Sequence, residues 1–147
     1  MGRLAGRRQG AARPALGELG VVAGVPVAIG DDVEGLLEFV KHGVALYVGG
    51  MGAKGKNFYN DLAVRYGFAE EAATIQDLYL AGRKEEAAAA VPDELVRQTS
   101  LIGPESWVAE RVAAFAEAGV TVLTAQPLDD TPAGRRRTIE TLARIAR

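Results

Sequence analysis

The sequence predicts a helix-rich α/β protein with parallel strands, and three observations support this prediction. Residues 21–29 form a β-branched, almost entirely apolar run, which is the pattern of a buried strand. Residues 104–147 are typical of a helix, a short strand and a second helix joined by tight connections, the unit of a parallel α/β fold. Between these two parts, apolar residues recur mainly at helical spacing.

The composition indicates a globular protein and excludes several kinds of site. The 147 residues suffice for one domain with a real core, and 48% of them are hydrophobic and 24% charged. A net charge of −2 gives no attraction to nucleic acid or to anionic membranes. The chain has no cysteine and a single histidine, His42, so disulfides, thiolate metal sites and multi-histidine metal sites are excluded. With no apolar run near the ~20 residues of a membrane span and no secretory signal, we expect a cytoplasmic protein without membrane or nucleic-acid partners.

The first half of the chain is expected to hold a strand and a helix. Residues 1–20 carry four arginines among glycine and alanine, and we expect a mobile arm there or the end of a preceding helix. After the strand at 21–29, Asp31 or Asp32 is placed to cap the next helix. Residues 44–48 either finish that helix or form a short strand, because their spacing does not decide between the two. The apolar residues at helical spacing are Leu36, Leu37, Val40 and Val44.

The middle of the chain predicts short helices separated by glycines. Three are expected at residues 58–66, 70–80 and 84–90. Gly67 and Gly82 follow the first two at the position where a left-handed residue commonly ends a helix. Another short helix begins at Asp93 and carries Leu95 and Val96, and residues 99–102 are short and apolar.

The C-terminal part gives the clearest pattern. A helix is expected at 104–118, with Pro104 in its first turn and Gly119 after its end. Its apolar stripe consists of Val108, Val112 and Phe115. A strand at 120–123 and a polar loop at 126–131 follow. Thr131 and Pro132 then open a last helix, whose expected inner face is Ile139, Leu142 and Ile145.

The stretch from 47 to 67 carries the strongest chemical signal. It places glycines and lysines between an apolar run and an amphipathic segment: Gly49, Gly50, Gly52, Gly55, Lys54 and Lys56. A glycine-rich turn with lysines can present N–H groups and positive charge to an anionic ligand. Residues 50–57 also approach the phosphate-binding pattern G-x-x-x-x-G-K-[ST], although Asn57 stands where a hydroxyl should bind magnesium. A flexible loop between two helices is the competing interpretation.

Other conspicuous side chains have ordinary structural interpretations. His42 lies near a helix end, which favours packing or a helix-terminal role over catalysis. Trp107 lies beside an apolar stripe and is expected in the core or on the exterior of a barrel, and not as a stacking platform. Aromatic residues near the loop are expected mainly in the core, with one or two lining a pocket: Tyr47, Phe58, Tyr59 and Tyr66. Arg135, Arg136 and Arg137 are expected to form a solvated helix face.

Several long segments together resemble a known family. They are VPVAIGDDVE (25–34), ALYVGGMGAKGKNFYNDLAVRYG (45–67), IQDLYLAGRKEEAAAAVPDELV (75–96), SLIGPESWVAERVAAFAEAGV (100–120) and the final strand and helix. In this order they resemble the luciferase-like monooxygenase superfamily, and within it the actinobacterial oxidoreductases that use the deazaflavin coenzyme F420. The resemblance runs from about residue 16 to the end.

The resemblance implies a partial (β/α)8 TIM barrel. The strands at 21–29 and 120–123 would be the seventh and eighth, and residues 33–96 a helical insertion before the seventh barrel helix. The chain would therefore hold the last two βα units plus this insertion. A complete barrel needs ~250 residues, so strands one to six would be absent. We expect residues 1–20 to be an arm or truncated lead-in, and 21–147 the C-terminal part of the barrel domain.

The same resemblance implies hydride transfer between coenzyme F420, or alternatively FMN, and a small organic substrate, with the isolated chain inactive. The implied cofactor-binding residues are Gly49, Gly50, Gly52, Lys54, Lys56 and Asn57. No catalytic residue and no metal site is assigned. An exposed apolar face would favour a homo-oligomer or pairing with the missing barrel half. The alternatives are a small nucleotide-binding α/β protein that uses residues 50–57, and a noncatalytic, truncated interaction domain.

Overall fold

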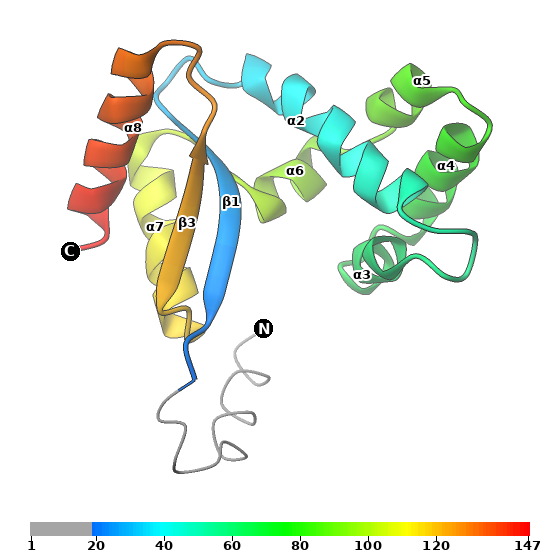
Figure 1. Cartoon of the computed structure of the whole chain (residues 1–147), viewed down its shortest axis with the longest axis horizontal. Helices are drawn as coiled ribbons and strands as arrows, with labels where there is room; N and C mark the ends of the chain where they lie inside the picture. Colours follow the sequence, from blue (N-terminus) through cyan, green and yellow to red (C-terminus); the bar gives the residue numbers. More distant parts are fainter. Residues whose placement is uncertain (1–18) are drawn as a thin grey trace. The chain divides into compact units, whose positions relative to one another are not determined.

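The computed structural model describes residues 19–147, so most of the arm predicted at 1–20 lies outside the described residues. The described chain divides into two compact units (Figure 1). The sheet unit contains residues 19–31 and Leu101–Arg147, and the helical unit contains Asp32–Ser100. The chain leaves the first unit after its first strand and returns to it at its second strand.

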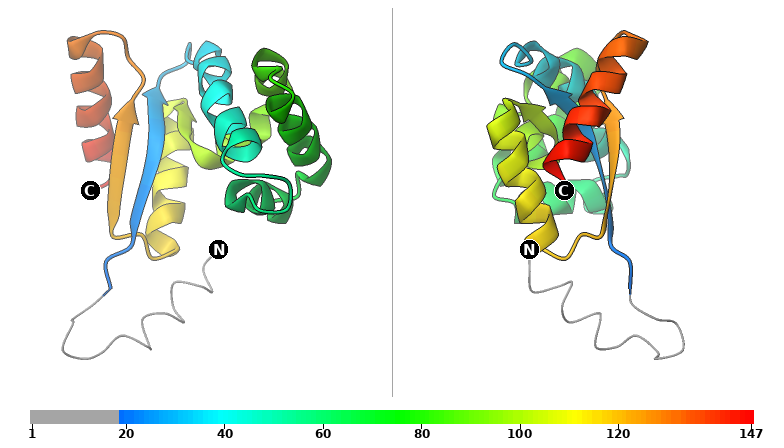
Figure 2. Two further views of the ribbon diagram at one scale, coloured as in Figure 1. Left: turned by 45° about the vertical axis from the view of Figure 1, so that its right-hand side comes forward. Right: turned by 90° about the vertical axis from the view of Figure 1, so that its left-hand side faces the viewer.

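The sheet unit is built on three parallel strands in the order β2-β1-β3. Their bounds are Val22–Ile29 for β1, Leu101–Gly103 for β2 and Val122–Pro127 for β3. The central strand pairs Val27 with Leu101 on one side and Val22 with Val122 on the other. Two helices, α7 (Glu105–Glu117) and α8 (Pro132–Ile145), cover one face of this sheet (Figures 1 and 2). The parallel α/β class predicted from the sequence is confirmed.

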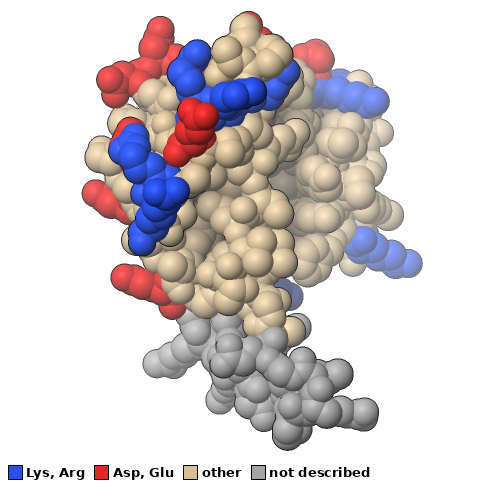
Figure 3. All heavy atoms as spheres, turned by 60° about the vertical axis from the view of Figure 1, so that its left-hand side comes forward, with Lys and Arg blue, Asp and Glu red and all other residues tan. Residues whose placement is uncertain are grey.

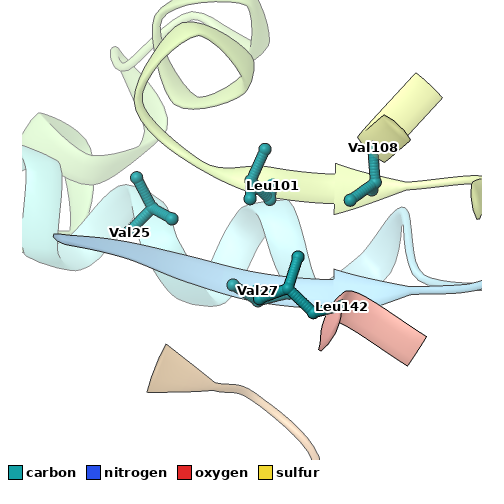
Figure 4. Close-up of a cluster of buried hydrophobic side chains, with 5 residues drawn as sticks. All are labelled: Val25, Val27, Leu101, Val108 and Leu142. Atoms are coloured by element: carbon teal, nitrogen blue, oxygen red, sulfur yellow. The ribbon is translucent and has the colours of Figure 1, made fainter. Parts of the chain in front are cut away.

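The core of the sheet unit lies between the covered face and the two helices. Its buried members come from β1, β2, α7 and α8 and point toward one another (Figure 4): Val25, Val27, Leu101, Val108 and Leu142. The predicted α7 stripe is confirmed, because Val112 and Phe115 pack against this cluster with Trp107. On the opposite face, Val22 is 63% and Val122 is 49% exposed. The face is open to solvent around these two residues, whereas Ala28, which strand alternation places on the same face near the other end of β1, is 3% exposed.

Three details of the sheet unit differ from the sequence expectations. Strand β3 continues to Pro127, so Gln126 lies in the strand and not in a loop, because β3 forms a ladder along most of β1. Residues 101–103 form strand β2, which spacing alone did not identify because it has only three residues. Ile139 is 43% exposed, whereas Thr138 and Leu142 are the buried residues on that part of α8.

The helix ends of the sheet unit follow the predicted signals. The Thr131 hydroxyl accepts a hydrogen bond of 3.0 Å from the Gly134 N–H, which caps α8 directly before Pro132. Gly119 follows α7 with φ of 90°, a left-handed conformation that favours glycine.

The helical unit consists of short helices throughout. Their bounds are Gly35–Ala45 for α2, Leu46–Gly50 for the π-helical turn η2, Phe58–Arg65 for α3, Ala69–Leu80 for α4, Lys84–Ala89 for α5 and Asp93–Thr99 for α6. Gly67 and Gly82 have positive φ after α3 and α4, as predicted. The expectation of an Asp31 or Asp32 cap is wrong, because α2 begins at Gly35 with Glu34 at the N-cap position, and Glu34 makes no side-chain capping bond.

Small side chains dominate the core of the helical unit. Its buried alanines are Ala45, Ala63, Ala72, Ala87 and Ala88. Around them pack Leu37, Val48, Ile75, Val91, Leu95 and Val96. Because alanine adds only a methyl group, short helices that carry it can approach closely and still bury their faces. The prediction that a short helix begins at Asp93 and carries Leu95 and Val96 is confirmed.

One cation is buried in the helical unit. The Lys41 ammonium on α2 lies 2.6 Å from Asp93 on α6 and 2.6 Å from Glu38 on its own helix. Asp93 and then Glu38 raise the pKa of Lys41 above its ordinary value, and Lys41 lowers the pKa of Asp93. The ion pair joins α2 to α6 and keeps the buried charge compensated.

We expect Val27→Ala to destabilise the protein by about 2 kcal/mol, because it removes fully buried methyl groups and leaves a cavity. Val22→Ala is the matched control on the same strand, where the side chain is 63% exposed, and should change stability by less than about 0.5 kcal/mol. Urea unfolding of both variants measures the difference. Equal losses would contradict the assignment of buried and open faces of β1.

Candidate functional site

The glycine–lysine loop, defined here as residues 49–57, follows a helix and not a strand. Residues 44–48, which the sequence left undecided, finish α2 and enter the π-helical turn η2. A phosphate-binding loop of the G-x-x-x-x-G-K-[ST] kind needs a strand before it. The nucleotide-binding alternative therefore lacks its structural context. The helix predicted after the loop is confirmed as α3.

The first two glycines of the loop permit close packing of η2 on α4. A Cβ atom at Gly49 would lie 2.5 Å from the Tyr79 Cβ and 3.0 Å from the Ile75 carbonyl oxygen. A Cβ atom at Gly50 would lie 2.4 Å from the Tyr79 ring. Only a residue without a side chain fits at these contacts. The two glycines thus bring the backbone of η2 against α4.

The remaining glycines shape the tip of the loop. A Cβ atom at Gly52 would lie 2.5 Å from the Lys56 carbonyl oxygen, so the two sides of the loop touch through their backbones. The Lys56 N–H donates a 2.9 Å hydrogen bond to the Ala53 carbonyl. Gly55 has φ of +72° at the third position of this four-residue turn, where glycine is favoured. The loop joins two helices, as the competing interpretation expected, and its backbone forms a closed turn.

Asn57 is buried at the base of the loop and uses its whole carboxamide internally. Its Nδ2 donates to the carbonyls of Tyr47 at 3.0 Å and Val48 at 2.9 Å. Its Oδ1 accepts from the N–H groups of Tyr59 at 3.0 Å and Asn60 at 3.2 Å. The side chain therefore caps α3 and holds the end of η2 at the same time. With two donors and two acceptor sites occupied, it has no remaining capacity for a ligand.

Two further amides, which the sequence did not single out, hold the loop on α4. Asn60 Nδ2 donates to the carbonyls of Val48 at 3.1 Å and Ala72 at 2.8 Å. Gln76 on α4, which is 5% exposed, donates to the Gly52 carbonyl at 3.3 Å. We call the three side chains of Asn57, Asn60 and Gln76 the amide clamp. No sequence signal marks Gln76, because its partner lies 24 residues away.

The two lysines of the loop lie at the solvent. Lys54 forms an ion pair with Asp77 on α4, and both side chains are more than half exposed. Lys56 is exposed and has no ion-pair partner among residues 19–147. No aspartate or glutamate occurs between Glu38 and Asp61 in the sequence. The loop therefore offers positive charge on a fixed turn, with Lys54 partly neutralised.

Aromatic side chains gather at the base of the loop. The rings of Tyr47 and Tyr59 lie edge to face at 4.8 Å, and those of Phe58 and Tyr59 at 5.5 Å. Tyr47, Phe58 and Tyr59 are 46%, 66% and 39% exposed, so the expectation that most of these rings lie in the core is wrong. The reason is the position of each ring on its helix. In η2, which contains Tyr47, the buried residues are Val48 and Gly49. In α3, which begins with Phe58 and Tyr59, the buried residue is Ala63.

His42 takes the helix-terminal place predicted for it. Its Nδ1 lies 3.2 Å from the Glu38 carbonyl, and its Nε2 lies 3.0 Å from Glu85 on α5. Glu85, and then the Glu38 carbonyl, raise the pKa of His42 above its ordinary value of 6.5. The ring joins α2 to α5 through these two contacts.

On the side that carries α8, the surface of the sheet unit bears charges of both signs (Figure 3). Figure 3 turns the side of the molecule that carries α8 forward, and basic and acidic side chains alternate there. The exposed residues Arg135, Arg136 and Arg137 form a solvated face, as predicted. Within residues 19–147, no three acidic or histidine side chains are grouped so as to hold a metal ion. In the same part of the chain, no helix is both long enough and apolar enough to cross a membrane.

Comparison with known proteins places the chain in a family. The sequence profile of the family described as Luciferase-like monooxygenase matches residues 3–122, which is most of the chain. The chain belongs to the luciferase-like monooxygenase family. A Mycobacterium tuberculosis relative, named "Putative coenzyme F420-dependent oxidoreductase", is 37% identical over 103 residues. These residues are 70% of this chain and 30% of that relative. This luciferase-like chain therefore spans less than a third of the length of the relative. No solved structure shows significant similarity.

The packing of η2 on α4 predicts opposite effects of two glycine substitutions. Gly49→Ala should destabilise the protein by about 1–3 kcal/mol, because its Cβ meets the Tyr79 side chain and the Ile75 backbone. Gly43→Ala in α2 is the matched control, since its Cβ meets nothing within 4 Å. It should stabilise by about 0.5–1 kcal/mol through helix propensity. Urea unfolding measures the sign of the change in the free energy of unfolding for each variant. An unchanged stability of Gly49→Ala would contradict this packing.

The His42 contact predicts a pH-dependent stability. Because the pKa of His42 is raised in the folded state, its stabilising contribution is fully present below the unfolded value near 6.5 and is lost as pH rises through the folded pKa. In an NMR titration, His42 should titrate above 6.5, and Glu85→Gln should lower its pKa. Asp61→Asn, at an exposed carboxylate on α3, serves as the control and should leave it unchanged. A His42 pKa at or below 6.5 would contradict the contact.

Proposed function

We propose that the chain is part of an oxidoreductase that transfers hydride between a deazaflavin or flavin and a small organic substrate. The observation that carries this proposal is the family membership, together with the 37% identity to a relative named as dependent on coenzyme F420. Coenzyme F420 is our first choice of cofactor, and FMN is the alternative. We further propose that the chain is inactive without the remaining parts of such an enzyme.

The proposed architecture is part of a (β/α)8 barrel formed by residues 21–147. Strands β1 and β3 would be neighbouring barrel strands, with α7 and α8 on the outside and the helical unit as an insertion. Two observations support this arrangement. The β1 and β3 pair is parallel along six residues, and its open face carries exposed valines, Val22 and Val122. Along its other edge, β3 has no partner strand among residues 19–147. A barrel would pair this edge and cover that face.

The proposed contribution of this chain to the cofactor site is the glycine–lysine loop. Its exposed lysines, Lys54 and Lys56, fit an anionic group such as the tail of the cofactor. The backbone at Gly49, Gly50 and Gly52, together with Asn57, would give the loop the shape in which it meets that tail. The cofactor carries the hydride, whereas these residues bind and orient it. Because Lys54 already pairs with Asp77, Lys56 is expected to contribute the larger part of the attraction.

The test is a fluorescence titration of the purified chain with coenzyme F420 and with FMN, with the oligomeric state checked by light scattering. We expect saturable binding that is stronger for coenzyme F420. Lys56→Ala should weaken it about tenfold, which is about 1.4 kcal/mol, and Lys54→Ala should weaken it less.

Arg65→Ala, at an exposed cation at the far end of α3, is the matched control and should bind as the unsubstituted chain does. Unchanged affinity in the Lys54→Ala, Lys56→Ala double variant would remove the loop from the cofactor site. Absence of binding by a folded chain would place the whole cofactor site outside this part of the enzyme.

A further inference from the structure

We infer that Asn57 is a positioning residue that holds the glycine–lysine loop in its binding shape before any ligand arrives, and that it acts through Lys56. This inference rests on the proposed function, because it concerns how the same loop would meet the anionic ligand. It changes the role of Asn57 from a direct contact, as the sequence suggested, to an internal support. Three properties of the loop carry it.

The first property is that Asn57 connects both ends of the loop. Its Nδ2 group donates to the carbonyls of Tyr47 and Val48 on the η2 side. Its Oδ1 accepts from two N–H groups in the first turn of α3, on the other side. The loop is therefore closed at its base by one side chain that is 1% exposed. All its hydrogen-bonding groups are engaged, so it is not available to a ligand.

The second property is that the tip has little remaining freedom. The Lys56 N–H is bonded to the Ala53 carbonyl, and Gly52 touches the backbone of Lys56 across the loop. Gln76 holds the Gly52 carbonyl from α4. A long, exposed lysine on a mobile loop would lose conformational entropy on binding, and a fixed turn removes the backbone part of that cost.

The third property is that Lys56 immediately precedes Asn57 in the chain. The backbone of Lys56 is thereby fixed on one side by the clamped residue and on the other by the turn that begins at Ala53. Loss of the clamp should move the start of the Lys56 side chain more than that of any other charged residue in the loop. The effect of Asn57 on anion binding should therefore require Lys56.

Asn57→Ser separates clamping from capping. A serine hydroxyl accepts hydrogen bonds well at a helix N-cap and is uncharged, but it does not supply the two N–H donors that hold Tyr47 and Val48. Val96→Ala is the matched control, because Val96 is fully buried in the core of the same unit and lies on α6, away from the loop. It lowers the stability of the unit without altering the clamp.

The first measurement is amide hydrogen exchange in the 147-residue chain. We expect Asn57→Ser to speed exchange at the Lys56 amide at least tenfold, while amides in the interior of α8 keep their rates. In Val96→Ala, the Lys56 amide should exchange more slowly than it does in Asn57→Ser. Equal Lys56 exchange in Asn57→Ser and the unsubstituted chain would overturn the inference, as would an equal acceleration by Val96→Ala.

The second measurement is a double-variant cycle on coenzyme F420 affinity with Asn57→Ser, Lys56→Ala and both together. We expect Asn57→Ser to weaken binding about tenfold alone and not to weaken it further in the Lys56→Ala background. Equal losses in both backgrounds would overturn the action through Lys56. Absence of binding, or a Lys56→Ala variant that binds normally, would overturn the proposed function and the cofactor role of Asn57 with it. The exchange measurement would then still decide whether Asn57 orders the loop.

Discussion

The arrangement of the helical unit depends on the close approach of the backbone of η2 to α4. Side-chain-free positions at Gly49 and Gly50 let Tyr79 lie directly against the turn. In this π-helical turn after α2, the carbonyls of Tyr47 and Val48 accept hydrogen bonds from Asn57 and Asn60. The start of α3 is fixed by the same carboxamide. The position of the rest of the loop follows from the packing of its first two glycines.

The sheet unit depends on a different constraint, the central place of β1. Its side chains alternate between the two faces of the sheet, so that Val25 and Val27 lie in the core while Val22 on the other face is exposed. Strand β2 is short but buried at all three residues, and it places the start of α7 beside the core. Strand β3 adds a longer ladder but has an exposed residue at every second position. The unit is thus well packed on one side of its sheet.

Much of the fold could be predicted from the sequence because the relevant signals are local. Glycine at Gly67, Gly82 and Gly119 ends helices for a reason intrinsic to the residue, and Thr131 followed by proline begins one. Signals that depend on a partner failed. Gln126 belongs to a strand only because β1 pairs with it, and Ile139 is exposed because α8 turns Thr138 and Leu142 inward.

The candidate site could be located from the sequence, but the roles of its residues could not. Glycines that approach a phosphate and glycines that admit a tyrosine look alike in a sequence, since both only lack a side chain. The sequence also leaves the role of Asn57 open, because a carboxamide can either bind a ligand or close a turn. Its burial in the structure favours the second role. Gln76 and Tyr79 belong to another helix, so nothing near the loop in the sequence indicates them.

The amide clamp consists entirely of groups that do not titrate. Salt screens the charges of the two lysines and the ion pair between Lys54 and Asp77, but it does not act on the uncharged carboxamides that fix the backbone. The charge of the loop and the shape of its backbone are therefore set by separate residues. The lysines and Asp77 set the charge, and the amide clamp sets the shape. Either one can change during evolution while the other is kept.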